Sequence, residues 1–305
     1  MTTAAPEALA AAQAALRLCA TQALPSPCLL LVPTPIGNLA DIGLRALALL
    51  ARCDRVAAED TRMAQRLLQA YGLHKPLLRA DRHREQAAAE ALLRHLAAGE
   101  RVAFVSDAGT PGINDPGAAL VRAAREAGHT VMPLPGPSAV TTALSASGFA
   151  LDSGYSFVGY VPSSAQQRDV FWRAQLDAPR AVVCFETPHR IEASLRALQQ
   201  AAREAPPRVL LAKELSKQFE NLVEGTPQQL LDWLAADAQR AHGEFVLVLQ
   251  PAAAAAPELA QARRWLLRLA RELPASRAAA VVAELFDADR KALYAWLLEQ
   301  PRAAR

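Results

Sequence analysis

Four charged side chains stand directly after short apolar runs, where strands are expected to end. In an open α/β sheet, ligands bind beside the carboxyl ends of the strands. A carboxylate there, or a lysine whose pKa is lowered by burial, can take a proton from a hydroxyl group. Structural ion pairs, Asp60 with Arg62 or Lys213 with Glu214, are the alternative. The candidate catalytic residues are Asp60, Arg62, Glu186 and Lys213.

The stretch Arg101–Gly117 offers a binding loop rather than a reactive group. The apolar run Val102–Val105 stops at Ser106, and three glycines and two prolines occur within the next eleven residues. Such a loop is rigid and lets a ligand lie against backbone. The alternative is a tight turn that binds nothing. Asp107 can pair with an ammonium group or a ribose hydroxyl, or simply cap the loop.

Several well-known classes of enzyme are excluded because their sequence motifs are missing. No strand leads into G-x-G-x-x-G, which excludes the dinucleotide fingerprint. Gly112 and Gly117 have P-loop spacing, but Ala118 and Ala119 replace the lysine and hydroxyl residue that hold phosphate and Mg²⁺. There is no G-x-S-x-G elbow, no C-x-x-C pair and no H-E-x-x-H helix, so neither a hydrolase triad nor a metal site is expected. The similar loops PTPIGN, SDAGTPG and PGPS instead suit a compact organic ligand held by backbone groups.

The elements that position these loops alternate between strand and helix. Short, continuous apolar runs are typical of parallel strands buried on both faces. Five such units in the first 148 residues predict a parallel, helix-covered sheet. The expected strands are 28–32, 55–58, 77–78, 102–105 and 130–134.

The second half predicts another α/β domain with a mixed sheet. Strands are expected at 155–160, 180–185, 208–212 and 243–249, and two or three short helices close the chain. The predicted organisation is a mobile extension at 1–27, a cofactor domain at 28–148, a second α/β domain at 149–250 and a helical module at 258–305.

Composition sets broad limits. The chain has 305 residues, of which 52% are hydrophobic and 21% charged, as expected for a globular protein with packed cores. A net charge of +3 is too small to establish a nucleic-acid partner. There is no apolar run near membrane-spanning length and no secretory signal, so a cytoplasmic location and no membrane partner are expected.

Seven collinear segments resemble the tetrapyrrole-methylase superfamily of S-adenosylmethionine-dependent methyltransferases. Within it they resemble the branch that methylates a ribose 2′-hydroxyl of a cytidine in the decoding region of small-subunit (16S) ribosomal RNA. The segments are LVPTPIGNLADI (31–42), AAEDTR (57–62), VSDAGTPGINDPG (105–117), PLPGPSAVTTALSASG (133–148), FETPHR (185–190), AKELSK (212–217) and GEFVLVL (243–249).

The resemblance implies two α/β domains with S-adenosylmethionine in the cleft between them, a homodimer, and ribosomal RNA within an assembled small subunit as partner. The cofactor contacts that it implies from the first domain are Pro35, Ser106, Asp107, Ala108, Gly109, Thr110, Pro135, Gly136 and Ser138. Those that it implies from the second domain are Phe185, Ala212, Gly243, Glu244 and Phe245.

Two other functions fit the same pattern. One is a carbon methyltransferase acting on a tetrapyrrole, because a fold does not fix a substrate. The other is a non-catalytic α/β protein that binds a nucleotide as a regulator. RNA binding would need local basic patches, since the net charge is small. The candidate patches are Arg79, Arg82 and Arg84; Arg168 and Arg173; and His189 and Arg190.

Overall fold

The computed structural model describes residues 4–81, 85–115, 117–176, 178–202, 206–251 and 257–299. Its first sheet has the strand order β3-β2-β4-β1-β5, and every pairing in it is parallel. The predicted parallel sheet is therefore confirmed. Its strands are β1 (Cys28–Leu31), β2 (Arg55–Ala58), β3 (Leu77–Arg79), β4 (Arg101–Val105) and β5 (Thr130–Pro133).

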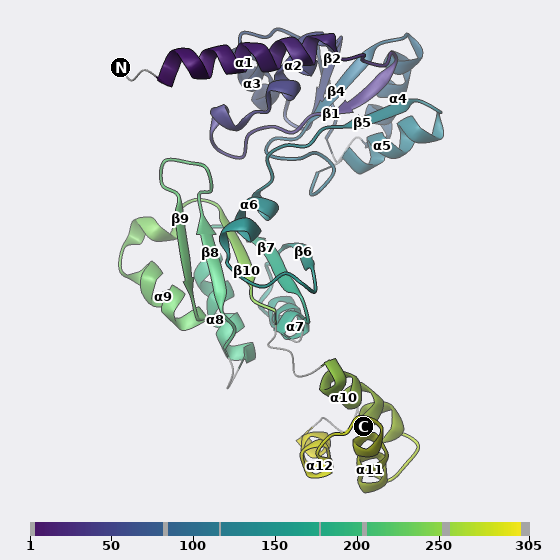
Figure 1. Cartoon of the computed structure of the whole chain (residues 1–305), viewed down its shortest axis with the longest axis vertical. Coiled ribbons are helices and arrows are strands. Elements are labelled where there is room, and N and C mark those ends of the chain that lie inside the picture. Colours follow the sequence, from purple (N-terminus) through teal and green to yellow (C-terminus); the bar gives the residue numbers. More distant parts are fainter. Residues whose placement is uncertain are drawn as a thin grey trace.

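Helices cover both faces of this sheet (Figure 1). The apolar side chains of α2 (Leu44–Arg52) and α3 (Thr61–Ala70) pack on one face, and those of α4 (Glu85–Ala97) and α5 (Gly117–Glu126) pack on the other. Alternate residues of β1 reach opposite cores, as the two-residue period of a strand requires. Burial on both faces explains why the central strands β1, β2 and β4 are mostly apolar. A short 3₁₀ helix, Leu39–Asp41, precedes α2.

The described part of the N-terminal extension lies against this domain. Helix α1 (Ala4–Thr21) packs along α2. Arg52 donates to the carbonyl oxygens of Cys19 and Gln22, and Ser26 Oγ donates to the carbonyl of Gly99 at 2.7 Å. Residues 19–26 are thus hydrogen-bonded to the fold, and the mobility of the extension stays a prediction.

The second sheet has the order β6-β7-β10-β8-β9 and is mixed, as predicted. Only β6 and β7 pair in parallel. Strand β9 was not predicted from the sequence, because only Leu222 and Val223 of its five residues are apolar and most of the strand is exposed, as at a sheet edge. The strands are β6 (Tyr155–Tyr160), β7 (Ala181–Glu186), β8 (Val209–Lys213), β9 (Asn221–Gly225) and β10 (Phe245–Leu249).

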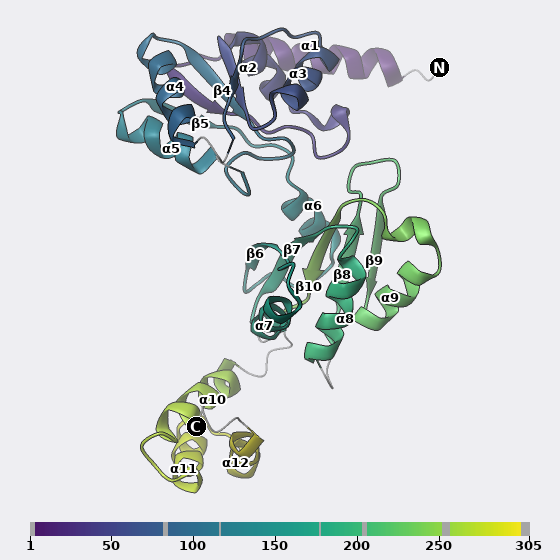
Figure 2. The same ribbon diagram turned by 180° about the vertical axis from the view of Figure 1, so that it is seen from behind.

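Helices α7 (Ala165–Leu176), α8 (Ile191–Ala202) and α9 (Pro227–Ala235) cover one face of the second sheet (Figure 2). Helix α6 (Ala139–Ala146) covers the other, where Val140, Ala143 and Leu144 join the core of β7, β8 and β10. By its packing α6 thus belongs to the second sheet. The chain passes between the sheets at Leu134–Ser138, before the boundary at residue 148 that the sequence predicts.

Helices α10 (Pro257–Leu269), α11 (Ala275–Leu285) and α12 (Arg290–Glu299) form a module with its own apolar core (Figure 1). That core includes the fully buried Leu266, Val282 and Leu297. Across the whole described chain, no helix has the length and apolar character needed to cross a membrane.

Candidate functional site

Three loops at the carboxyl ends of β1, β4 and β5 are tied together by hydrogen bonds. Thr34 and Gly109 exchange backbone bonds of 3.0 and 3.1 Å, which join the first loop to the second. Thr110 Oγ1 donates to the carbonyl of Pro137 at 2.9 Å, which joins the second loop to the third. Ser106 Oγ donates to the carbonyl of Gly109 at 3.0 Å and closes the second loop on itself. The loops therefore form one pre-organised wall.

Two glycines in the loops are required by close approach. A Cβ on Gly136 would lie 2.4 Å from Pro33 Cβ, and one on Gly37 would lie 2.4 Å from Lys217 Cγ. Gly109 also has φ +79°, a backbone conformation that favours glycine. A larger residue at Gly136 would push the third loop away from the first, and one at Gly37 would displace the side chain of Lys217.

Residues after Thr110 mainly serve the next helix. The Asp115 carboxylate accepts the N–H groups of Gly112, at 2.8 and 2.9 Å, and of Gly117, at 2.7 Å. It thereby fixes the start of α5. The expected helix-initiating Pro116 lies outside the described residues.

A cavity of about 340 Å³ lies between this wall and the ends of β6, β7 and β10. We call it the cleft cavity. Its volume falls in the range of small-molecule sites. It is lined by Ile36, Glu59, Ser106, Asp107, Ala108, Gly109, Thr110, Ile113, Asn114, Asp115, Ser138, Ala139, Val140, Tyr160, Phe185, Glu186, Glu244, Phe245 and Val246. It thus unites nine of the fourteen predicted cofactor contacts.

The other five predicted contacts do not line the cleft cavity. Pro35 lines a neighbouring cavity, and Gly136 packs on Pro33. Pro135 is exposed, whereas Ala212 is fully buried in the core under α6. Gly243 has φ +98° and leaves room for the side chain of Glu214. A contact of these five with a cofactor stays a prediction.

Tyr160 is a cavity residue that the sequence analysis did not select. It ends β6, and its ring meets Phe185 edge-on, with 5.5 Å between ring centroids. Phe157 packs on Phe185 as well, at 4.8 Å. Burial, and next the charge of Glu244, raise the pKa of the Tyr160 hydroxyl, so it stays a neutral donor. Parallel pairing of β6 with β7 brings this ring to the cleft, which local periodicity does not reveal.

Glu186 is the only one of the four candidate catalytic residues that lines the cleft cavity. Its carboxylate is fully buried and well satisfied. It accepts from Ser194 Oγ, from Thr187 N at 2.8 Å and from Arg190 Nη2 at 2.8 Å. Three donors thus already occupy this carboxylate. These contacts favour a structural role, in which Glu186 joins β7 to the start of α8.

Asp60 and Arg62 form the ion pair that the sequence analysis gave as the alternative. Asp60 caps α3 by accepting Arg62 N, and its carboxylate receives Arg62 Nε at 3.1 Å and Nη2 at 2.8 Å. The Arg62 side-chain hydrogen bonds, together with the cap bond, hold the pKa of Asp60 far below its ordinary value. This lowered basicity favours the structural role for the pair.

Lys213 is buried at the end of β8, beside Phe245 of β10. The ion pair with Glu214, which was the alternative to a catalytic role, is not found among the described residues. Glu214 instead bonds Lys217 Nζ at 2.9 Å, and Lys217 bridges to Glu244 at 2.8 Å. Because Glu244 lines the cleft cavity, this three-residue cluster braces its wall.

A second cavity of about 240 Å³ adjoins the first between the β1 loop and α3. It is lined by Pro35, Leu39 and Met63, among others, and it shares Ser106 and Asp107 with the cleft cavity. Asp107 is exposed, and within the described part of the chain its carboxylate accepts a single hydrogen bond, from the N–H of Asp60 at 3.3 Å. Asp107 therefore faces both cavities.

The predicted basic patches are mostly engaged in the fold. Arg168 is buried and donates to the carbonyls of Pro162 and Ser163, and Arg173 pairs with Asp169. These contacts contradict Arg168 as a surface contact for RNA. Arg190 pairs with Glu186, as above, while Arg82 and Arg84 lie outside the described residues. Arg79 pairs with Asp81, and His189 is exposed.

Taken together, two α/β domains enclose a cleft cavity of cofactor size, walled by backbone-rich loops. This is the architecture of the tetrapyrrole (corrin/porphyrin) methylases, and that family's model matches residues 29–231. The chain belongs to this family. A second model, the RsmI C-terminal HTH domain, matches residues 255–301.

The comparisons also identify similar individual proteins. Ribosomal RNA small subunit methyltransferase I of Escherichia coli O157:H7 is 44% identical over 273 residues, which is 89% of this chain and 95% of that protein. The protein of the same name from Vibrio cholerae serotype O1 is 43% identical over 277 residues, 90% of this chain and 95% of that protein.

Solved structures with lower identity share the fold. Uroporphyrin-III C-methyl transferase from Thermus thermophilus, complexed with S-adenyl homocysteine, has a TM-score of 0.51 at 18% identity and covers 74% of this chain and 97% of its own. A diphthine synthase has a TM-score of 0.56 at 16% identity and covers 73% of this chain and 90% of its own. At these identities the likeness supports the fold alone, and the fold class predicted from the sequence is confirmed.

Proposed function

We propose that this protein transfers a methyl group from S-adenosylmethionine to the 2′-hydroxyl of a cytidine in the decoding region of small-subunit ribosomal RNA. The observation that carries the proposal is the cleft cavity between the two domains, in a chain 44% identical to a ribosomal RNA small subunit methyltransferase. Backbone-rich loops on one side and two aromatic rings on the other fit a compact cofactor with a flat base.

The residues that would hold the cofactor are those that line the cleft cavity from both domains. Ser106–Thr110 and Ser138 offer backbone and hydroxyl groups, while Phe185 and Tyr160 offer ring faces and edges. S-adenosylmethionine supplies an electrophilic methyl group when it is bound. The main task of the protein is then alignment, which can account for a large part of the rate.

Asp107 is the residue best placed to act on the acceptor hydroxyl. It faces both cavities, and unlike Glu186 and Asp60 it carries no partner arginine among the described residues. Its carboxylate can accept the proton of the 2′-hydroxyl or orient that group toward the cleft cavity. Lys213, which lines neither cavity, is a less direct candidate.

The partner and location belong to the same proposal. The substrate is ribosomal RNA within an assembled small subunit, the protein acts as a homodimer, and it works in the cytoplasm. The names of the similar proteins support the RNA substrate.

Tritium transfer from labelled S-adenosylmethionine tests the function. The purified protein is incubated with small subunits, with free ribosomal RNA, or with a uroporphyrinoid. The subunits and the RNA come from a strain that lacks this gene. A 2′-O-methylated cytidine in digested RNA from the subunits is the expected product. Labelled porphyrinoid with unlabelled RNA would instead assign a carbon methyltransferase. Cofactor binding without any transfer would indicate a regulatory protein.

A further inference from the structure

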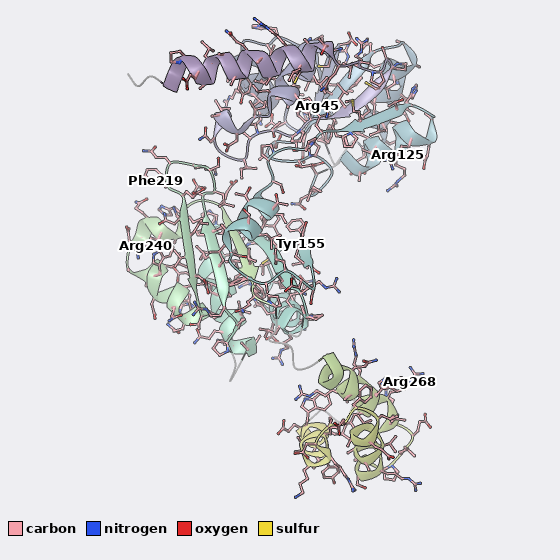
Figure 3. The ribbon with its side chains drawn as sticks, in the orientation of Figure 1. Arg45, Arg125, Tyr155, Phe219, Arg240 and Arg268 are labelled. Atoms are coloured by element: carbon pink, nitrogen blue, oxygen red, sulfur yellow. The ribbon has the colours of Figure 1, made fainter. Side chains whose placement is uncertain are left out.

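The outward face of α10 and the turn that follows it carry three exposed arginines and a tryptophan. Arg264 and Arg268 are four residues apart, so they lie on one side of the helix, and Arg271 follows in the turn after Leu269. Trp265 lies beside them, 46% exposed. These side chains line a shallow groove, and Arg268 extends to the outside of the module (Figure 3).

The charge on this face is not balanced by acidic side chains. Among the described residues, none of Arg264, Arg268 and Arg271 has an ion pair. In contrast, Arg173 of α7 pairs with Asp169, and Arg196 of α8 pairs with Glu192, each an acid four residues earlier. Arg264 and Arg268 are four residues apart, so their like charges destabilise the helix slightly. An anionic ligand would remove that cost.

The opposite side of α10 shows what an arginine of this module does when it is structural. Arg263 stacks on the Trp296 ring, 4.9 Å from its centroid, while Ala262 and Leu266 are fully buried in the module core. The folding of the module thus uses that side of α10 and leaves Arg264, Trp265, Arg268 and Arg271 unused.

We propose that this face of α10 binds the phosphate backbone of ribosomal RNA, with Trp265 stacking on an unpaired base. Arginine recognises phosphate through its planar fork, and aromatic rings beside a basic track are typical of single-stranded nucleic-acid binding. The inference rests on the proposed function, because it assigns the RNA of that reaction as ligand. It places the contact on the first helix of the module and not on the α11–α12 pair.

The test is the salt dependence of RNA binding by the full-length protein. R264Q/R268Q is compared with R122Q/R125Q, an equally exposed arginine pair on α5 (Arg125 is labelled in Figure 3). Losing two phosphate contacts should lower the slope of log affinity against log salt by about 1.4–1.8 and weaken binding about 30-fold at 0.1 M salt. R122Q/R125Q should leave both the slope and the affinity unchanged.

Trp265 gives a readout that does not depend on charge. Trp265→Ala should weaken the binding of a single-stranded fragment of small-subunit RNA about tenfold, whereas Trp265→Phe keeps a stacking ring and most of the affinity. Equal effects of the two arginine pairs, or no effect of either, would overturn the proposal. So would α10-dependent binding to anionic vesicles with RNA binding unchanged. Methyl transfer is measured separately, so an inactive protein that still binds RNA through α10 would refute only the proposed function.

Discussion

Asp107 offers the most direct test of how the cleft works. Its carboxylate is exposed, faces both cavities and makes one backbone bond, to Asp60 N at 3.3 Å. Removing it leaves a single N–H that water can reach, so Asp107→Ala should change the free energy of unfolding by less than about 0.5 kcal/mol. Any large effect on binding would then come from the ligand and not from folding.

The expected loss of affinity follows from the bond that is removed. A hydrogen bond to a charged group contributes about 1.5–3 kcal/mol. If Asp107 holds the ammonium or a ribose hydroxyl of the cofactor, Asp107→Ala should raise the Kd for S-adenosylmethionine about 10- to 150-fold. Isothermal titration calorimetry measures this directly. Asp107→Asn keeps an acceptor oxygen without the charge, so its Kd should lie between those of the unmodified protein and Asp107→Ala.

Asp115 supplies the matched control, because it lies in the same loop and lines the same cavity. Its carboxylate holds the N–H groups of Gly112 and Gly117, so Asp115→Ala should lower the melting temperature while Asp107→Ala does not. Unchanged cofactor affinity in Asp107→Ala would refute the reasoning on cofactor binding. A lowered kcat with unchanged affinity would instead assign Asp107 to the acceptor hydroxyl alone.

Three further predictions concern the walls of the cleft. Glu186→Gln leaves Arg190 without its partner and should reduce the free energy of unfolding by about 3 kcal/mol in chemical denaturation; a change below about 1 kcal/mol would contradict a structural role. Tyr160→Ala should raise KM for S-adenosylmethionine severalfold while Tyr160→Phe does not, because the ring makes the contact; equal effects would point to the hydroxyl. Burial raises the pKa of Glu214, but its bonds to Lys217 and Glu244 lower the pKa overall. The stabilisation by Glu214 is therefore fully present above the ordinary glutamate pKa of about 4.3 and is lost as the pH falls through the lower pKa of the folded protein. Lys217→Met should make the free energy of unfolding depend less steeply on pH in this acidic range. An unchanged pH dependence would contradict this.

The sequence by itself determined the order of the elements and the edge at which the loops gather. Apolar runs separated by helical periods predict parallel strands, and parallel strands place all their following loops on one edge. That is why Ser106–Thr110 and Ser138 could be assigned to the cleft cavity from residue types and family motifs alone. Edge strand β9 was missed, because a short strand with only two apolar residues has no such signature.

Only the tertiary structure decided which side chains meet across the cleft. Thr110 reaches Pro137 across 27 residues, and Ser216 reaches Asp41 across 175. Such contacts cannot be predicted from the local spacing of apolar residues, because they depend on how the two sheets pack. For the same reason the sequence could not show that Glu186 is held by Ser194 and Arg190, that Lys213 lies beside Phe245, or that Tyr160 reaches the cavity. Strand ends identify where chemistry can occur, but the neighbours of each charge decide whether it is free to act.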